Sequence, residues 1–106
     1  MMNKMKLVYI AGVYRGKCID DIYENIQVAR KYAKKYWNLN YAVICPHMNS
    51  AFMDGSCTDE VFLDGGIEIL KRCDIIVMLP NWKNSPGAIN EFNIAINNGL
   101  KIIYED

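Results

Sequence analysis

Residues 6–12 read Lys-Leu-Val-Tyr-Ile-Ala-Gly, a short β-forming run with apolar side chains on both faces that ends at a glycine. A strand that is apolar on both faces is typical of the middle of a parallel sheet, where helices cover each side. We therefore expect residues 6–11 to form a central strand, and the loop that starts at Gly12 to lie at its carboxyl end.

The segment after this strand has the spacing of a helix. Apolar residues recur every three or four positions over residues 20–37, and residues 21–24 can form a capping box. The residues predicted to face the core are Ile22, Ile26, Ala29 and Ala33. Residues 41–45 predict a second strand, which Pro46 ends, and residues 46–58 are expected to form a loop.

A second helix and a third strand follow. The helical segment, residues 59–72, contains Gly65 and Gly66, and a glycine inside a helix costs about 1 kcal/mol relative to alanine. Two adjacent glycines there need an explanation. Residues 74–79 contain a continuous apolar run that is typical of a buried strand, and residues 80–84 predict a polar loop.

A third helix begins at Ser85, a natural N-cap, with Pro86 in its first turn, and it ends before Gly99. The stripe predicted to face the core consists of Ile89, Phe92 and Ile96. Residues 101–104 predict the fourth strand.

Strands and helices therefore alternate within one domain, residues 1–106. Right-handed crossovers predict an α/β fold with a small open parallel sheet of four strands in the order 2-1-3-4 and helices on both faces, as in flavodoxin-like and Rossmann-like folds. Ligands of such sheets bind at the carboxyl ends of the strands. The loops expected there are residues 12–16, 46–49 and 80–87.

Composition excludes several classes of protein. The 106 residues include 12 Lys+Arg and 12 Asp+Glu and are 52% hydrophobic, which indicates one globular domain and disfavours a nucleic acid polymer as partner. The longest apolar stretches, residues 7–13 and 75–80, are far shorter than the roughly 20 residues of a membrane span. No secretory signal is visible, so we expect a cytoplasmic protein. So short a chain has little stability in reserve, which favours a homodimer or higher homo-oligomer.

The four cysteines form no C-x-x-C pair, and they are Cys18, Cys45, Cys57 and Cys73. Reduced thiols are the simplest interpretation. Cys45 and His47 are the one nearby pair of soft metal ligands, and no further ligand follows at suitable spacing. We therefore expect neither a metal site nor an organic cofactor.

The loop after the first strand could hold a phosphate. Gly12 and Gly16 allow the backbone to turn sharply or to approach a ligand closely, while Tyr14 and Arg15 lie between them. The loop has neither a dinucleotide-binding nor a P-loop pattern. A plain turn with a solvated arginine is the competing interpretation.

Glu91 lies one to two turns into the third predicted helix, and Gly87 and Ala88 precede it by four and three residues. Because helical side chains lean toward the amino terminus, Glu91 would extend over these two small residues toward the ligand edge of the sheet. The backbone N–H groups of Gly87 and Ala88 could bind an anionic group beside it. The alternative is a solvated surface glutamate.

Four motifs spread over nearly the whole chain suggest a family: Val8-Tyr9-Ile10-Ala11-Gly12-Val13-Tyr14-Arg15-Gly16, Pro46-His47-Met48-Asn49, Arg72-Cys73-Asp74-Ile75-Ile76-Val77 and Ser85-Pro86-Gly87-Ala88-Ile89-Asn90-Glu91. Together they resemble the nucleoside 2-deoxyribosyltransferase-like proteins, which include nucleotide N-glycosidases and a small phage and bacterial branch. The resemblance implies that Glu91 attacks the anomeric carbon of a nucleoside or its 5′-monophosphate and expels the base. It also implies that Tyr9 lies near that carboxylate.

Such a reaction needs a second acidic group that protonates the departing base. The aspartate that the resemblance implies in this role falls on Gly66, and the nearest carboxylate is Asp64. Either the two glycines loosen the helix so that Asp64 reaches the site, or the acid is missing and turnover is slow or absent.

The resemblance also implies phosphate contacts from Arg15, Ser85 and Gly87. Classical transferases carry a base-binding aspartate in the place of Ser85, so the serine favours 5′-monophosphates over free nucleosides. Ser85 serves equally well as a helix cap. Trp82 could stack on a base or form an apolar lid, and His47 could order its loop or act as a general base.

The leading hypothesis is an N-glycosidase or deoxyribosyltransferase-like enzyme that acts on a small-molecule nucleotide. The alternative is a nucleotide-binding or sensing module that has kept the pocket and has little or no catalytic activity. A phosphoacceptor signalling domain ranks last, because Ala11 and Leu79 stand where it would need an aspartate.

Overall fold

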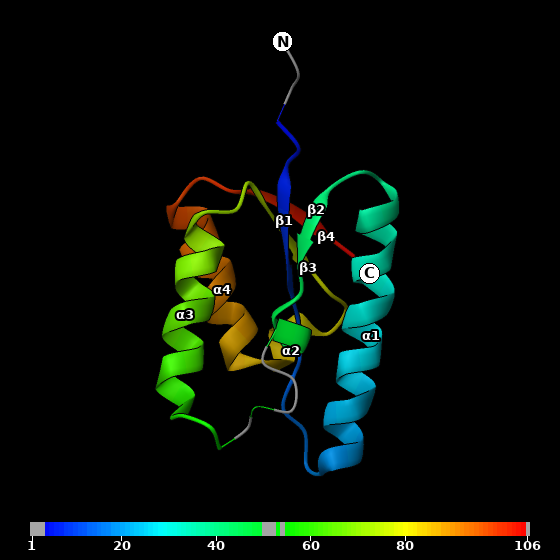
Figure 1. The fold of residues 1–106 in the computed structure, drawn as a ribbon, viewed down its shortest axis with the longest axis vertical. Helices are drawn as coiled ribbons and strands as arrows, with labels where there is room; N and C mark the ends of the chain where they lie inside the picture. Colours follow the sequence, from blue (N-terminus) through cyan, green and yellow to red (C-terminus); the bar gives the residue numbers. More distant parts are fainter. Residues whose placement is uncertain (1–3, 50–52, 54, 106) are drawn as a thin grey trace.

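The fold is a four-stranded sheet with helices on both faces, as Figure 1 shows. The computed structural model describes residues 4–49, 53 and 55–105. Along the chain the elements are β1 (Leu7–Ala11), α1 (Ile19–Asn38), β2 (Ala42–Ile44), α2 (Pro46–Asn49), α3 (Asp59–Lys71), β3 (Ile75–Met78), the 3₁₀ helix η1 (Trp82–Asn84), α4 (Pro86–Asn97) and β4 (Lys101–Tyr104).

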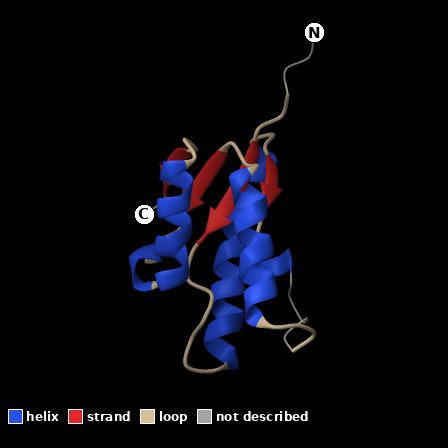
Figure 2. Ribbon diagram, turned by 90° about the vertical axis from the view of Figure 1, so that its left-hand side faces the viewer, coloured by secondary structure: helices blue, strands red, loops and turns tan. Residues whose placement is uncertain are grey.

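The sheet confirms the expected fold class. Its strands pair in the order β2-β1-β3-β4, and every pairing is parallel. Figure 2 shows the strands side by side, and the pairing order places β1 and β3 in the centre. All four carboxyl ends therefore meet at one edge of the sheet, where the loops after β1 and β3 begin.

Successive residues of β1 point to opposite faces of the sheet and enter two separate cores. Val8 and Ile10 pack with Ala29 and Ala33 of α1. Tyr9 packs on the other face, which α3 and α4 cover, in a cluster that includes Leu70 and Ala88. The alternation places the Tyr9 side chain between the sheet and the α3–α4 pair.

Two predicted details at the first helix are wrong or incomplete. Cys18 is the N-cap of α1 and makes no side-chain capping bond, so no capping box forms. Asp21 instead accepts a hydrogen bond from the backbone N–H of Lys17, at 2.9 Å. The helix buries Ala29 and Ala33 as predicted, and Ile22 and Ile26 are half-buried.

Two predicted loops contain short helices. The first four residues of the 46–58 loop form α2, and the loop after β3 contains η1. Both are single turns that follow within a few residues of a strand, too short to give the repeated apolar spacing from which helices are recognised in a sequence.

The predicted core stripe of α4 is also partly wrong. Ile89 and Ile96 are 37% and 50% exposed, whereas Ala88 and Ala95 are buried. Small residues allow the helix to lie close to the sheet, so the buried face is the one with the alanines. Phe92 is partly buried against the same core, as predicted.

Within the described ranges, none of the helices is both long and apolar enough to cross a lipid bilayer.

Candidate active site

Glu91 lies on the sheet-facing side of its helix and is half-buried. It lies on α4 three residues after the buried Ala88 and four residues before the buried Ala95, so all three share the sheet-facing stripe. The Tyr9 hydroxyl, in the middle of β1, donates a hydrogen bond to Oε2 of Glu91. The Tyr9 side chain is almost entirely buried.

The start of α4 fixes the position of Glu91. Ser85 is the N-cap, and its Oγ accepts a hydrogen bond from the backbone N–H of Ala88 at 3.1 Å. Pro86 occupies the first turn, where its missing N–H has no consequence. The helix therefore begins at a defined residue, and Glu91 follows about one and a half turns later.

Burial changes the ionisation of this pair. Removal from water raises the pKa of Glu91 to about 7, and the hydrogen bond from Tyr9 opposes that rise. Burial and the neighbouring Glu91 carboxylate raise the pKa of Tyr9 well above its ordinary value of 10.0. Near pH 7 Tyr9 is therefore a protonated donor, while Glu91 is divided between its acid and its carboxylate.

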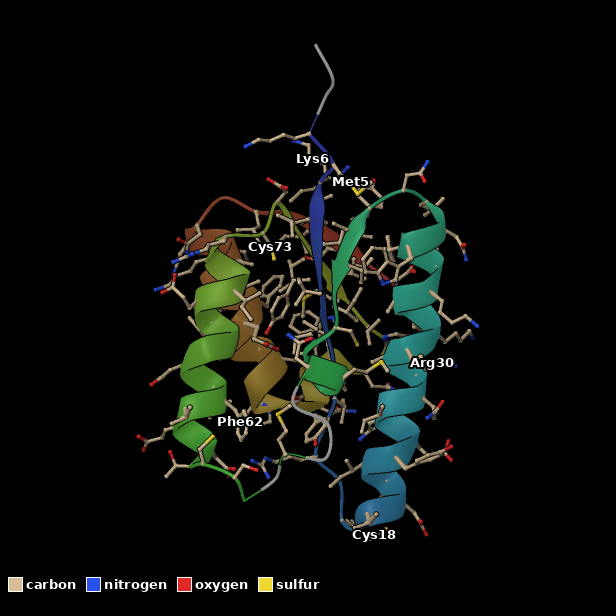
Figure 3. The ribbon with its side chains drawn as sticks, viewed as in Figure 1. Met5, Lys6, Cys18, Arg30, Phe62 and Cys73 are labelled. Atoms are coloured by element: carbon tan, nitrogen blue, oxygen red, sulfur yellow. The ribbon has the colours of Figure 1, made fainter. Side chains whose placement is uncertain are left out.

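Tyr9 lines a hollow of about 200 Å³ beside this pair. The other described residues that line it are Pro46, Asn49, Met53, Val61, Phe62, Gly65, Gly66 and Ile69. Figure 3 shows Phe62 near the amino-terminal end of α3, on the side toward the middle of the molecule, where it is half-buried. Glu91 is not among these lining residues, and its link to the hollow is the Tyr9 hydroxyl.

The glycine pair of α3 has a structural explanation here. A Cβ atom at Gly66 would lie 3.5 Å from the Tyr9 hydroxyl, and one at Gly65 would meet nothing within 4 Å. Any side chain longer than a methyl group at position 66 would therefore extend beside the hydroxyl. The two glycines keep the α3 wall of the hollow open next to Tyr9.

The loop after β1 lies at the same end of the molecule as the start of α3 (Figure 1). Arg15 forms an ion pair with Asp59, the first residue of α3, at 3.0 Å, and both side chains are about three-quarters exposed. A Cβ atom at Gly12 would lie 2.9 Å from the Leu79 side chain, and one at Gly16 would lie 2.2 Å from Cβ of Asp21. Close packing therefore explains both glycines without a ligand.

His47 is buried and orders the same loop. Its side chain is 6% exposed, and Nε2 lies 2.9 Å from the carbonyl oxygen of Val13. Because a carbonyl only accepts, Nε2 carries the proton and Nδ1 does not. Burial lowers the pKa of His47, so the ring is neutral near pH 7. The Tyr14 ring meets it edge-on, with centroids 5.6 Å apart.

The remaining predicted site residues lie in different surroundings. Trp82 packs on Phe92 and Tyr104, with ring centroids 4.7 and 6.4 Å away. The indole is partly buried and packs against the core on the α4 face. Asp64 is exposed on α3 and does not line the hollow, and Gly87 is exposed at the start of α4.

Sequence reasoning brought Tyr9 and Glu91 together but missed the hollow beside them. Val61, Phe62, Gly65 and Ile69 recur at helical spacing on one side of α3, and this pattern could have identified the wall. Asn49 could not have been found in this way, because its position depends on the single turn of α2.

The described residues contain no group of three or more His, Cys, Asp or Glu side chains arranged to hold a metal ion. All four cysteines are free thiols. Figure 3 shows Cys18 and Cys73 at opposite ends of the molecule.

Comparison with known proteins identifies both a family and a fold. The model of a family described as a domain of unknown function (DUF4406) matches residues 6–104. A 2-deoxyribosyltransferase from the psychrotolerant bacterium Bacillus psychrosaccharolyticus, described as a biocatalyst for the synthesis of antiviral and antitumoral nucleosides, has a similar solved structure. The TM-score is 0.71 at 16% sequence identity, over 92% of this chain and 70% of that chain. No curated protein matches the sequence.

Proposed function

Since this chain belongs to the DUF4406 family and has a nucleoside 2-deoxyribosyltransferase-like fold, we propose that it cleaves the N-glycosidic bond of a nucleoside 5′-monophosphate or a related nucleotide. Glu91 is the nucleophile in this proposal. The observation that carries it is the sheet-facing Glu91 carboxylate, which is hydrogen-bonded to a tyrosine that lines a hollow of about 200 Å³.

The proposed reaction has two steps, as in a retaining glycosidase. The Glu91 carboxylate bonds to the anomeric carbon while the bond from that carbon to the base nitrogen breaks. The base leaves with the electron pair and takes up a proton. Water, or an acceptor base, then attacks the anomeric carbon and releases Glu91. Tyr9 orients the carboxylate through its hydrogen bond and is not consumed.

The hollow suits a flat heterocycle. Its walls include the apolar side chains of Phe62 and Ile69, and Asn49 supplies one amide group that can hydrogen-bond to the edge of a base. The side-chain-free surface of Gly65 and Gly66 leaves room beside the Tyr9 hydroxyl.

Phosphate recognition is the second part of the proposal. The proposed contacts are Arg15, in the loop after the carboxyl end of β1, and Ser85 and Gly87, at the start of α4. Ser85 Oγ accepts a hydrogen bond from Ala88, and its own proton remains available for donation to a phosphate oxygen. Arg15 is paired with Asp59 and would exchange that partner for the phosphate.

The proton taken up by the base comes from Asp64 or from water. Asp64 is the nearest carboxylate to Gly66 along α3, and its exposure favours water as the donor. The Asp64→Asn variant distinguishes the two sources. A rate within about twofold of the wild type assigns the proton to water, and a loss of a hundredfold or more, the ordinary size of acid catalysis, assigns it to Asp64.

The decisive experiment compares the wild type with Glu91→Gln and with Glu24→Gln, an exposed glutamate on α1. Each protein is incubated with a panel of nucleoside 5′-monophosphates and the parent nucleosides, and the free base is measured by chromatography. We expect Glu91→Gln to bind the substrate and release no base, and Glu24→Gln to behave as the wild type. Undiminished base release by Glu91→Gln would overturn the assignment.

A nucleotide-binding module without turnover is the second candidate, and the absence of a side chain at Gly66 favours it. The lining of the hollow includes no carboxylate among the described residues. Calorimetry with the same nucleotide panel separates the candidates, because binding without release of base supports the module.

A further inference from the structure

Side chains hold the loop between β1 and α1 in place. Among the described residues, no backbone–backbone hydrogen bond is formed by Gly12, Val13, Arg15 or Gly16. Such a segment would sample many conformations unless other groups fixed it. If it became ordered only when a ligand bound, the loss of conformational entropy would lower the affinity for that ligand.

Three consecutive carbonyl groups of this loop are bound by two side chains. His47 Nε2 donates to the carbonyl of Val13 at 2.9 Å. Asn25 Nδ2 donates to the carbonyls of Tyr14 and Arg15, at 3.0 and 3.4 Å. The Asn25 amide therefore spans the two peptide groups on either side of the Arg15 backbone.

Asn25 is placed on a rigid support. It precedes Ala29 and Ala33 by four and eight residues, so it lies on the side of α1 that packs against the sheet. The asparagine is half-buried in a stripe that is otherwise apolar. A polar residue is suitable at this position because the helix here extends past the end of β1 and faces the loop.

Bound carbonyls favour an anionic ligand. A carbonyl oxygen that turns toward a phosphate repels it, whereas N–H groups and the Arg15 guanidinium attract it. While Asn25 holds the carbonyls of Tyr14 and Arg15, neither oxygen can rotate toward an anion at the edge of the sheet. We therefore propose that Asn25 is a positioning residue that holds the β1–α1 loop in the conformation that receives the phosphate of a nucleoside 5′-monophosphate. This inference rests on the proposed function.

The test uses two variants of Asn25 and one control. Asn25→Asp has the same shape and replaces the N–H donor with an oxygen that repels both carbonyls, and Asn25→Ala removes the group. The control is Gln27→Ala, an amide on the same helix that makes no hydrogen bond with the described residues. The kcat and KM for base release are measured with a nucleoside 5′-monophosphate and with its parent nucleoside.

We expect both Asn25 variants to raise the KM for the monophosphate by about tenfold, which corresponds to one or two ordinary hydrogen bonds. The kcat, and both constants for the nucleoside, should stay within about twofold of the wild type. Amide hydrogen exchange at residues 13–16 should become faster. A merely structural role would instead raise the KM for both substrates equally and lower the melting temperature in proportion.

The outcomes separate this inference from the function on which it rests. Equal changes for the two substrates, or an unchanged KM for the monophosphate, would overturn the role of Asn25 and leave Glu91 as nucleophile. A wild type that accepts the nucleoside and rejects the monophosphate would do the same. Failure of the wild type to bind or cleave any substrate would overturn both proposals.

Discussion

At the scale of single residues, the proposed nucleophile Glu91 is a half-buried ionisable group. A carboxylate removed from water has a raised pKa, and the hydrogen bond from Tyr9 compensates only in part. With a pKa of about 7, Glu91 is partly ionised in neutral solution, and the ionised fraction that the proposed reaction requires increases as the pH rises. The burial that places the carboxylate also reduces the stability of the fold.

That cost predicts a dependence of stability on pH. The pKa of Glu91 rises from 4.5 in the unfolded chain to about 7 in the fold, so the folded state holds the proton more tightly. The resulting stabilisation is complete below pH 4.5 and is lost as the pH rises through 7. Between pH 5 and 8 the loss amounts to about 2 to 3 kcal/mol of the free energy of unfolding.

Urea titrations at several pH values measure this loss. His47, whose pKa is lowered, contributes in the opposite direction, so the informative quantity is the difference between the wild type and Glu91→Gln. That difference should change by about 2 to 3 kcal/mol between pH 5 and 8, in favour of the variant at high pH. Parallel pH profiles for the two proteins would show that Glu91 is ionised normally.

A variant of Asp59 tests the proposed phosphate site. The Asp59 carboxylate forms an exposed ion pair with the Arg15 guanidinium, and such pairs contribute about 0.2 to 1 kcal/mol of interaction free energy. Asp59→Asn should therefore increase the affinity for a nucleoside 5′-monophosphate by about two- to fivefold at low salt, and leave the affinity for the nucleoside unchanged. Glu60→Gln, the neighbouring exposed carboxylate, is the control in the same calorimetric titrations. Equal effects of the two variants would reject a specific role for Asp59.

At the scale of elements, the capping residues at the start of α4 determine where Glu91 lies. The sequence predicted its start correctly, because Ser85 and Pro86 are strong local signals for a helix N-terminus. Its buried face was predicted only in part: Phe92 packs on the core as expected, but hydropathy favours isoleucine where the packing distance to the sheet favours alanine. The true face is the one that contains Glu91.

Ser85 allows its two proposed roles to be separated. Ser85→Ala should lower the free energy of unfolding by about 1 kcal/mol, because the N–H of Ala88 loses its partner. Ser85→Asp keeps a good cap, so its stability should equal that of the wild type. Its negative charge should lower the affinity for a nucleoside 5′-monophosphate severalfold. Thermal unfolding and calorimetry measure the two effects. Unchanged nucleotide affinity in Ser85→Asp would restrict the serine to capping.

In α3 the sequence indicated an unusual position without explaining it. Adjacent glycines at positions 65 and 66 lower the stability of the helix, which indicated that a side chain is unfavourable there for another reason. The tertiary structure supplies that reason, because the nearest atom to a Cβ at Gly66 is the hydroxyl of Tyr9, on a strand far earlier in the sequence. The single turns α2 and η1 left no periodic signal at all.

At the scale of the whole molecule, several large apolar side chains remain on the surface. Ile89 and Ile96 on α4 and Tyr104 on the edge strand β4 are between 37% and 53% exposed. A chain of 106 residues buries a modest share of its surface, and association of copies would add to it. We expect a homodimer that uses this α4–β4 surface.

Analytical ultracentrifugation tests that expectation. Ile96→Lys should shift the protein toward the monomer without loss of helical circular dichroism, because the residue is half-exposed in the single chain. Ile19→Lys, on an exposed residue at the start of α1, is the control and should leave the association state unchanged. A monomeric wild type, or an equal effect of both variants, would contradict the choice of surface.

The sequence by itself determined the sheet order, the α/β fold class and the identity of Tyr9 and Glu91 as neighbours. These follow from strand periodicity, chain direction, helix-capping signals and a family resemblance, all of which are local or are repeated along the chain. Only the tertiary structure decided the buried face of α4, the hollow beside Gly66, the Asn25 and His47 bonds to the first loop and the pairing of Arg15 with Asp59. Each of these depends on how closely elements distant in sequence approach one another, and packing distance leaves no pattern within a single element.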